Sequence, residues 1–155
     1  MNIMKLTTPT DQQLVELMSW FASEEELTVW SGPNFSYPFD LKSFKRDLKL
    51  NTLSSFSMVS SEGDLLAFGQ YYLRLGKCHL GRLVVNPRFR GKGIIARLIN
   101  QLIALGKSEL STQSCSLFVL AHTKSAINAY AKLGFCIVDY PEKIALENCL
   151  YMVQQ

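Results

Sequence analysis

A strand-to-helix junction over residues 83–96 constrains the fold of this chain more than any other segment. An apolar run ends at Pro87, and a loop with Gly91 and Gly93 then leads into a segment whose apolar residues recur at helical spacing. The first amide groups of a helix are unpaired and lie at the positive end of its dipole, and glycine leaves them accessible to phosphate oxygens. The junction therefore predicts a phosphate site, with a tight turn among solvated cations as the alternative. The neighbouring cations are Arg88, Arg90 and Lys92.

Two well-known phosphate-binding loops fit this junction poorly. A P-loop requires the pattern GxxxxGK[ST], but here Gly91-Lys92 is followed by glycine. The spacing Gly91-x-Gly93-x-x-Ala96 does match the GxGxxG/A pattern of dinucleotide-binding folds, which also need an acidic residue after the next strand. That strand ends in Leu-Ala-His-Thr over residues 120–123, without an acid. A nicotinamide-dependent enzyme is therefore disfavoured.

The periodicity of the apolar residues predicts a mixed sheet with helices on both faces. Strands over residues 52–60 and 65–75 flank a polar turn and form a hairpin, and a third strand runs over 78–85. The second half of the chain then alternates helices with short strands. We expect helices after Thr8 (the cap, with Pro9 in the first turn and Asp11 as the capping-box acid), after Ser23, over 41–50 after Asp40, after Gly93, and over 126–133 before Gly134. We expect further strands over 117–120, 135–140 and 144–153.

The composition is that of one ordinary globular domain over residues 1–155. Hydrophobic residues make up 48% of the chain and charged residues 19%, and the formal net charge is +3. That charge is too small to indicate nucleic-acid binding, and no run of about 18 apolar residues predicts a membrane span. The N-terminus lacks the apolar core of a signal peptide, so we expect a cytoplasmic protein with reduced, buried cysteines. The cysteines, Cys78, Cys115, Cys136 and Cys149, form no CxxC pair, and we expect no metal site.

Two motifs in the second half of the chain carry a resemblance to a known family. Arg88-Phe-Arg-Gly91-Lys-Gly93 matches the signature [QR]-x-x-G-x-[GA], and residues 126–135 end in Leu-Gly-Phe. In both motifs the chain resembles the GNAT superfamily of N-acetyltransferases, over roughly the last two thirds of its length. It departs from the family pattern at Thr123, where the family often has asparagine. The resemblance implies a GNAT-like fold, a twisted, mostly antiparallel mixed sheet of about six or seven strands that splays between strands 4 and 5.

The resemblance also implies that acetyl-CoA is the co-substrate and that no metal takes part. The pantetheine amides are expected to pair with the backbone of residues 83–85, and the pyrophosphate to lie on the amide groups of residues 90–95. These two regions belong to the strand and the helix that flank the glycine loop. The expected cofactor-binding residues are Leu83, Val84, Val85, Arg88, Arg90, Gly91, Lys92, Gly93, Ile94, Ile95, Thr123 and Ala126.

Two proton transfers must accompany acetyl transfer to an amine. An ammonium with a pKa of about 10.4 is less than about 0.1% neutral at pH 7 and must lose a proton, and the leaving thiolate must gain one. By resemblance, Tyr130 occupies the position of the family's general-acid tyrosine, although a core aromatic would fit the same helix face. His79 is the candidate base, because strand periodicity places it on one face with Leu83 and Val85. A chain of ordered water molecules is the alternative base, and His122, next to Thr123 at the end of the fifth strand, is a weaker candidate.

The loop over residues 30–39, which two prolines and a glycine keep irregular, is the predicted acceptor site. In the superfamily this region forms the acceptor pocket, where aromatic ring faces can hold a cationic amine. The same aromatics can equally pack onto the sheet. Arg82, the one charge in an apolar strand, either pairs with an acid or faces this cleft. The candidate acceptor residues are Trp30, Phe35, Tyr37 and Phe39.

Together these features predict an acetyl-CoA-dependent N-acetyltransferase. The acetyl group would pass directly, in a ternary complex, to a primary amine of a small molecule or peptide. The alternative is a catalytically weak acyl-CoA-binding domain that senses the cofactor, because Thr123 departs from the family pattern and the strand before the junction carries no carboxylate. We expect no nucleic-acid or membrane partner, and either a monomer or a homodimer.

Overall fold

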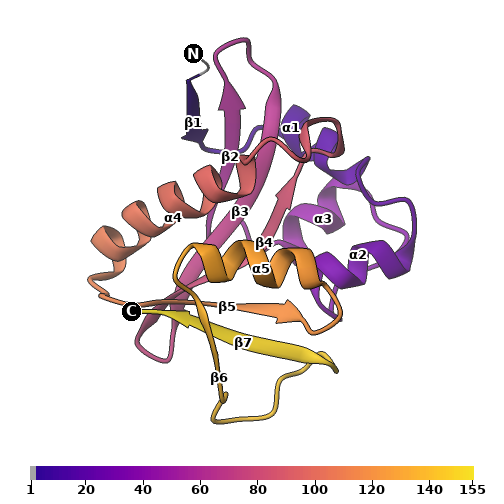
Figure 1. Cartoon of the computed structure of the whole chain (residues 1–155). Helices are drawn as coiled ribbons and strands as arrows, with labels where there is room; N and C mark the ends of the chain where they lie inside the picture. The colour runs from indigo at the N-terminus through magenta and orange to yellow at the C-terminus, as the bar shows by residue number, and fades with distance from the viewer. Residues whose placement is uncertain (1–2) are drawn as a thin grey trace.

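A seven-stranded mixed sheet with the strand order β1-β2-β3-β4-β5-β7-β6 is the centre of the computed structural model, which describes residues 3–155 (Figure 1). Neighbouring strands pair antiparallel, except that β4 and β5 pair parallel. The predicted fold class, a mixed and mostly antiparallel sheet with helices on both faces, is therefore confirmed. The strands are β1 (Met4–Thr7), β2 (Ser54–Ser60), β3 (Leu65–Arg74), β4 (Lys77–Val85), β5 (Cys115–Leu120), β6 (Cys136–Val138) and β7 (Cys149–Gln154).

Helices cover both faces of the sheet, and each face has its own apolar core (Figure 1). On one face, Leu98 and Leu102 are buried with Leu80 of β4, because apolar residues recur along the helix every three or four positions. On the other face, Phe44 packs with Phe68 of β3. Within residues 3–155, no helix has the length and apolar character needed to cross a bilayer. The helices are α1 (Asp11–Met18), α2 (Glu24–Ser31) and α3 (Leu41–Asp47) on the second face, and α4 (Ile94–Leu110) and α5 (Lys124–Lys132) on the first, with the short 3₁₀ helix η1 (Pro87–Phe89) before α4.

The helix starts follow the expected capping chemistry, with one shift. Ser23 and Asp40 cap α2 and α3 as predicted, although α3 ends at Asp47, earlier than expected. The prediction that Thr8 caps the first helix is wrong. Thr10 is the cap, and its hydroxyl accepts from the amide of Gln13, whose side chain in turn accepts from the amide of Thr10. A glutamine closes this capping box as well as an acid does, so the box forms two residues later than predicted.

The strands at the two ends of the chain differ most from expectation. β1 pairs with β2 but was not predicted, since a four-residue strand leaves little periodicity to detect. The last strand begins at Cys149 instead of residue 144, and residues 139–148 form the loop between β6 and β7. All four cysteines are free thiols; Cys78 and Cys115 are buried, whereas Cys136 is exposed on β6, contrary to the prediction of buried thiols.

β4 contains a β-bulge at Arg82. Two residues of β4, Arg82 and Leu83, lie opposite the single residue Gly69 of β3, and Arg82 has a positive φ of 49°. A Cβ on Gly69 would lie 2.7 Å from Leu102 Cδ1 and 3.0 Å from Leu83 Cδ2. Glycine is therefore required on β3 where the bulge brings Leu83 toward α4.

The bulge reverses the side-chain alternation along β4. Leu80, Leu83 and Val85 all pack into the core beneath α4, although a regular strand would place Leu80 on the opposite face from the other two. Val84 packs against the core of α1–α3. The prediction that His79 shares a face with Leu83 and Val85 is therefore wrong, because His79 lies on the face opposite Leu80.

Candidate active site

β4 and β5 separate after three residue pairs, and a cavity opens between them. Cys78, His79 and Leu80 pair with residues 115–117 of β5; beyond these pairs, β4 continues along β3 while β5 continues along β7. Figure 1 shows the two strands running apart from this point. The cavity has a volume of about 860 Å³ and is lined by both strands and by α2, α5 and the β6–β7 loop. The backbone of the unpaired ends therefore faces a space large enough for a bound molecule.

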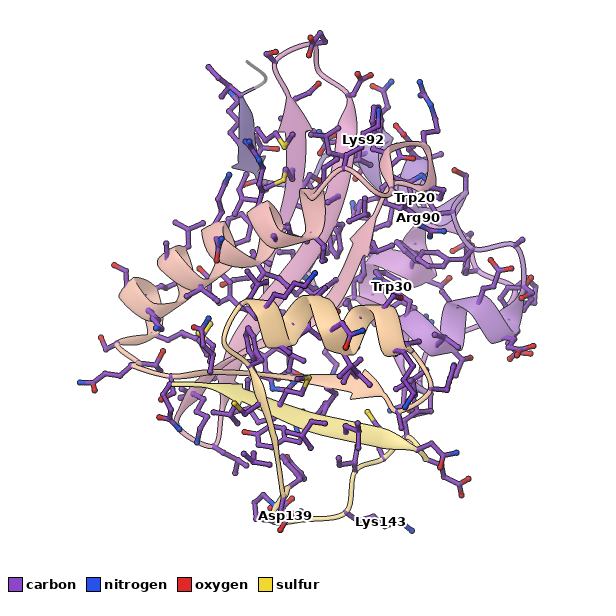
Figure 2. The ribbon with its side chains drawn as sticks, viewed as in Figure 1. Trp20, Trp30, Arg90, Lys92, Asp139 and Lys143 are labelled. Carbon is purple, nitrogen blue, oxygen red and sulfur yellow. The ribbon has the colours of Figure 1, made fainter. Side chains whose placement is uncertain are left out.

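The loop before α4 leaves the first amide groups of that helix uncapped. Gly91 and Gly93 have positive φ angles of 77° and 73°, which favour glycine, and nothing lies within 4 Å of a Cβ built on either. Gly93 is the N-cap residue and supplies no side-chain bond to the helix. Arg90 lines the cavity together with Trp20 and Trp30, and Figure 2 shows Arg90 and Lys92 on this loop. This combination of open backbone and cations suits an anionic group.

Tyr130 of α5 lines the cavity. It is half-buried, and its hydroxyl makes no hydrogen bond within residues 3–155. Burial raises the pKa of the phenol above its usual value, so the group is protonated at neutral pH. An unengaged, protonated hydroxyl in a cavity is available as a proton donor.

His79 is 1% exposed and borders the cavity from β4. Its Nδ1 lies 2.8 Å from Ser116 Oγ, and its ring lies 4.7 Å from the ring of Phe118, centroid to centroid. Burial, aided by the positive charge of Arg74, lowers the pKa of the imidazole to about 3. His79 is therefore neutral at physiological pH, and its conjugate acid is far too strong to retain a proton taken from an ammonium group.

The cavity is also lined by an arginine and three aromatic residues that are not among the predicted site residues: Arg74, Tyr72, Phe118 and Tyr140. Arg74 donates from Nη1 to the hydroxyl of Tyr140 (2.9 Å) and from Nη2 to that of Tyr72 (3.2 Å). Its guanidinium carbon lies 5.2 Å from the ring centroid of Phe118. Tyr72 and Arg74 are two residues apart on β3 and therefore lie on the same face, which the strand pattern of the sequence could have indicated. No local pattern indicates that Tyr140, in the β6–β7 loop, contacts Arg74.

Arg82 also lines the cavity, and its hydrogen-bond partner is an amide, not an acid. Nη1 donates to Gln70 Oε1 at 2.9 Å, and the guanidinium carbon lies 5.1 Å from the ring centroid of Phe35. Of the two predicted positions for Arg82, facing the cleft is therefore the one observed.

The four predicted acceptor aromatics belong to one cluster of ring contacts around Phe44, and of these four only Trp30 lines the cavity. Trp30 lines the cavity and stacks on Phe21 at 4.5 Å between ring centroids. Phe35 and Phe39 pack against the core of α1–α3, and Tyr37 is 41% exposed. The packing alternative thus describes Phe35 and Phe39, and Trp30 in part, because Phe44 of α3 offers all three a ring to pack on.

The predicted cofactor residues fall into three groups. Members of the first group line the cavity: Leu83, Val84, Arg90, Thr123 and Ala126. Members of the second group lie exposed on the loop before α4: Arg88, Gly91, Lys92 and Gly93. Members of the third group pack beneath α4 or at its start, where their backbone alone is available: Val85, Ile94 and Ile95.

Comparison with known proteins identifies the same architecture. The acetyltransferase (GNAT) family model matches residues 14–135. Spermidine N-acetyltransferase from Vibrio cholerae, solved with CoA and spermine, superposes with a TM-score of 0.73 at 14% identity, over 97% of this chain and 94% of that one. The ribosomal-protein-S18-alanine N-acetyltransferase from Escherichia coli gives 0.68 at 18% identity, over 98% and 93%. PaiA N-acetyltransferase from Thermoplasma acidophilum, solved with coenzyme A, gives 0.68 at 16%, over 99% of both chains.

Proposed function

Because the chain belongs to the acetyltransferase (GNAT) family, we propose that it transfers the acetyl group of acetyl-CoA directly to a primary amine of a small molecule or peptide. The observation that carries this proposal is the opening between β4 and β5, with the uncapped amides of α4 near one end and the free phenol of Tyr130 on its wall. The relatives acetylate amines of both kinds, spermidine in one case and an alanine of a ribosomal protein in another.

Acetyl-CoA fits the two backbone regions that the cavity leaves unpaired. The pyrophosphate would lie on the amides of residues 90–95, where glycine at 91 and 93 leaves room for its oxygens and Arg90 adds charge. The pantetheine amides would pair with the backbone of residues 83–85, along the part of β4 that has no neighbour on the β5 side. The thioester would then lie within reach of Tyr130.

The reaction requires the amine nitrogen to attack the thioester carbonyl, so that a C–N bond forms and the C–S bond breaks. The electron pair of the broken bond leaves on the sulfur of CoA. Tyr130 supplies the proton that the thiolate takes up, because burial keeps the phenol protonated and its hydroxyl is not engaged elsewhere within residues 3–155. The nitrogen that has formed the C–N bond loses its surplus proton to give the neutral amide, and that proton returns through water in the open cavity to the phenolate.

The proton of the incoming ammonium passes to water instead of His79. A base needs a conjugate-acid pKa near the working pH, whereas that of His79 is about 3. Its Nδ1 is also held against Ser116 Oγ at 2.8 Å. His79 is therefore a neutral residue in the cavity wall, and we assign the role of base to water instead of His79.

The proposal is tested by mixing the protein with acetyl-CoA and a panel of amines while free thiol is followed. Thiol release that depends on the amine, with the acetylated product seen by mass spectrometry, supports the transferase. Binding of acetyl-CoA by calorimetry without thiol release from any amine or peptide would refute it, and would favour an acyl-CoA-binding domain. Competition of NAD with CoA for the same site would favour a dinucleotide enzyme instead.

A further inference from the structure

Apart from Arg90, the charged residues that line the cavity are three cations and two acids. The cations are Arg74, Arg82 and Lys143, and the acids are Glu26 and Glu142; Lys143 and both acids are exposed, whereas the two arginines are partly buried. Glu26 already accepts a hydrogen bond from the amide of Ala22 at the start of α2. Figure 2 shows Lys143 on the β6–β7 loop, at the far end of the molecule from Arg90 and the loop before α4. Lys143 is therefore separate from the cations expected at the pyrophosphate, and Arg74 and Arg82 belong to the strands β3 and β4, not to that loop.

Both arginines have neutral partners only. Arg74 donates to the two tyrosine hydroxyls and Arg82 to the amide oxygen of Gln70, and each has a buried Nε atom without a hydrogen-bond partner within residues 3–155. Asp47 is the acid whose charge acts on Arg82, but its carboxylate already accepts from Arg46 Nε at 3.1 Å and from the amide of Ser36 at 2.8 Å. Neither guanidinium is thus neutralised by this part of the protein.

Partly buried guanidinium groups that line a cavity select the charge of a ligand. Burial lowers the pKa of Arg82, but an arginine remains charged at neutral pH, so the cost of desolvation stays. A ligand carboxylate would offset that cost through charge-assisted hydrogen bonds to the planar fork. A second ammonium on the acceptor would instead be repelled by both arginines. The positive charge of Arg74 also lowers the pKa of His79, although burial of the imidazole has the larger effect.

We propose that the acceptor is an amine that also carries a carboxylate, and that Arg74 or Arg82 binds this carboxylate in the cavity. This inference rests on the proposed acetyltransferase function and narrows its substrate class. The amine would point toward the thioester beside β4, and the carboxylate away from it. A polyamine, which has several positive charges and no carboxylate, would be a poor acceptor.

The test compares acceptors that differ only by a carboxylate: 6-aminohexanoate against pentylamine, L-lysine against cadaverine, and L-phenylalanine against 2-phenylethylamine. We expect kcat/KM, followed as thiol release, to be about tenfold to hundredfold higher for the carboxylate member of at least one pair, the size of a charge-assisted contact. Equal or faster acetylation of the carboxylate-free member in every active pair overturns the inference and leaves the acetyltransferase function standing. No thiol release from any amine overturns both.

Variants then locate the carboxylate. Arg74→Met or Arg82→Met should raise KM for the carboxylate member far more than for the carboxylate-free member and so remove the preference, while calorimetry should show an unchanged affinity for acetyl-CoA. The corresponding lysine variant should restore part of the preference, because it keeps the charge but loses the fork. Lys5→Met, which removes an exposed charge on β1 at the far edge of the sheet, should behave as wild type. A preference that survives in both methionine variants would refute the proposal.

Discussion

The neutral, buried state of His79 makes the stability of the fold depend on pH in a range where few other groups titrate. The folded-state pKa of about 3 lies below the ordinary value of 6.5, so the unfolded chain binds a proton more readily than the folded one. The stability that the neutral imidazole provides is therefore complete above pH 6.5 and is lost as the pH falls from about 6.5 toward 3. The effect has the opposite sign to that of a histidine paired with an acid.

The expected magnitude follows from the two pKa values. Between pH 7 and pH 5 the unfolded histidine goes from mostly neutral to almost fully protonated, while the folded one stays neutral. The free energy of unfolding should fall by about 2 kcal/mol over this interval, approaching about 1.4 kcal/mol per pH unit below pH 6. The shifted carboxyl groups do not interfere, since the pKa values of Asp40, Asp47 and Glu62 lie below their ordinary values of 3.8 and 4.5.

Urea denaturation of wild type, His79→Gln and His122→Gln at pH 7 and pH 5 measures this effect. Glutamine keeps a hydrogen-bonding group near Ser116 but cannot titrate, so the pH-dependent loss should be smaller by about 2 kcal/mol in His79→Gln. His122 is exposed at the end of β5, and its variant should keep the wild-type pH dependence. The same pH dependence in His79→Gln and wild type would refute the assignment of a buried neutral imidazole.

Three further substitutions test the site and its support. Tyr130→Phe should lower kcat roughly 10- to 10⁴-fold with little change in acetyl-CoA affinity measured by calorimetry; unchanged kcat would remove Tyr130 from the mechanism. Gly91→Val should weaken CoA binding at least about tenfold, because a β-branched side chain is strained at a φ of 77° and would occupy the space left for phosphate oxygens; normal affinity would contradict the placement of the pyrophosphate. Gly106→Ala should lower the free energy of unfolding by about 1–3 kcal/mol, because the added Cβ would overlap Cys78 Sγ and lie 3.3 Å from the ring of Tyr71, and a melting temperature equal to that of wild type would show that α4 can move away from the sheet.

Local signals carried most of the fold. α4 was predicted because its apolar positions repeat along one segment, and the hairpin of β2 and β3 because two alternating runs flank a polar turn. The cap of α1 was misplaced by two residues, since Thr8 and Thr10 both precede plausible first turns and only the reach of Gln13 distinguishes them. Short strands such as β1 depend on a partner far along the chain, so their own residues predict them poorly.

The chemistry of the site was less predictable because its residues meet through long-range contacts. The glycine loop and Tyr130 were accessible through motifs, since their spacing along the chain is itself the signal. Arg74 and Tyr140 are 66 residues apart, and only the return of β7 beside β5 brings the β6–β7 loop to β3. The low pKa of His79 is likewise a long-range effect, because rings from three strands surround the imidazole and bury it, and no local pattern predicts this arrangement.

The extra residue at Arg82 divides β4 into two halves whose side-chain alternation is offset by one residue. The first half pairs with strands on both sides, whereas the second pairs with β3 alone and has an unpaired edge on the β5 side within residues 3–155. Deleting that one residue would exchange inside for outside from Leu83 onward, turning Leu83 and Val85 away from α4 and Val84 toward it. A chimera in which this strand is exchanged with that of a relative must therefore keep the bulge, even where the sequences on either side of it agree.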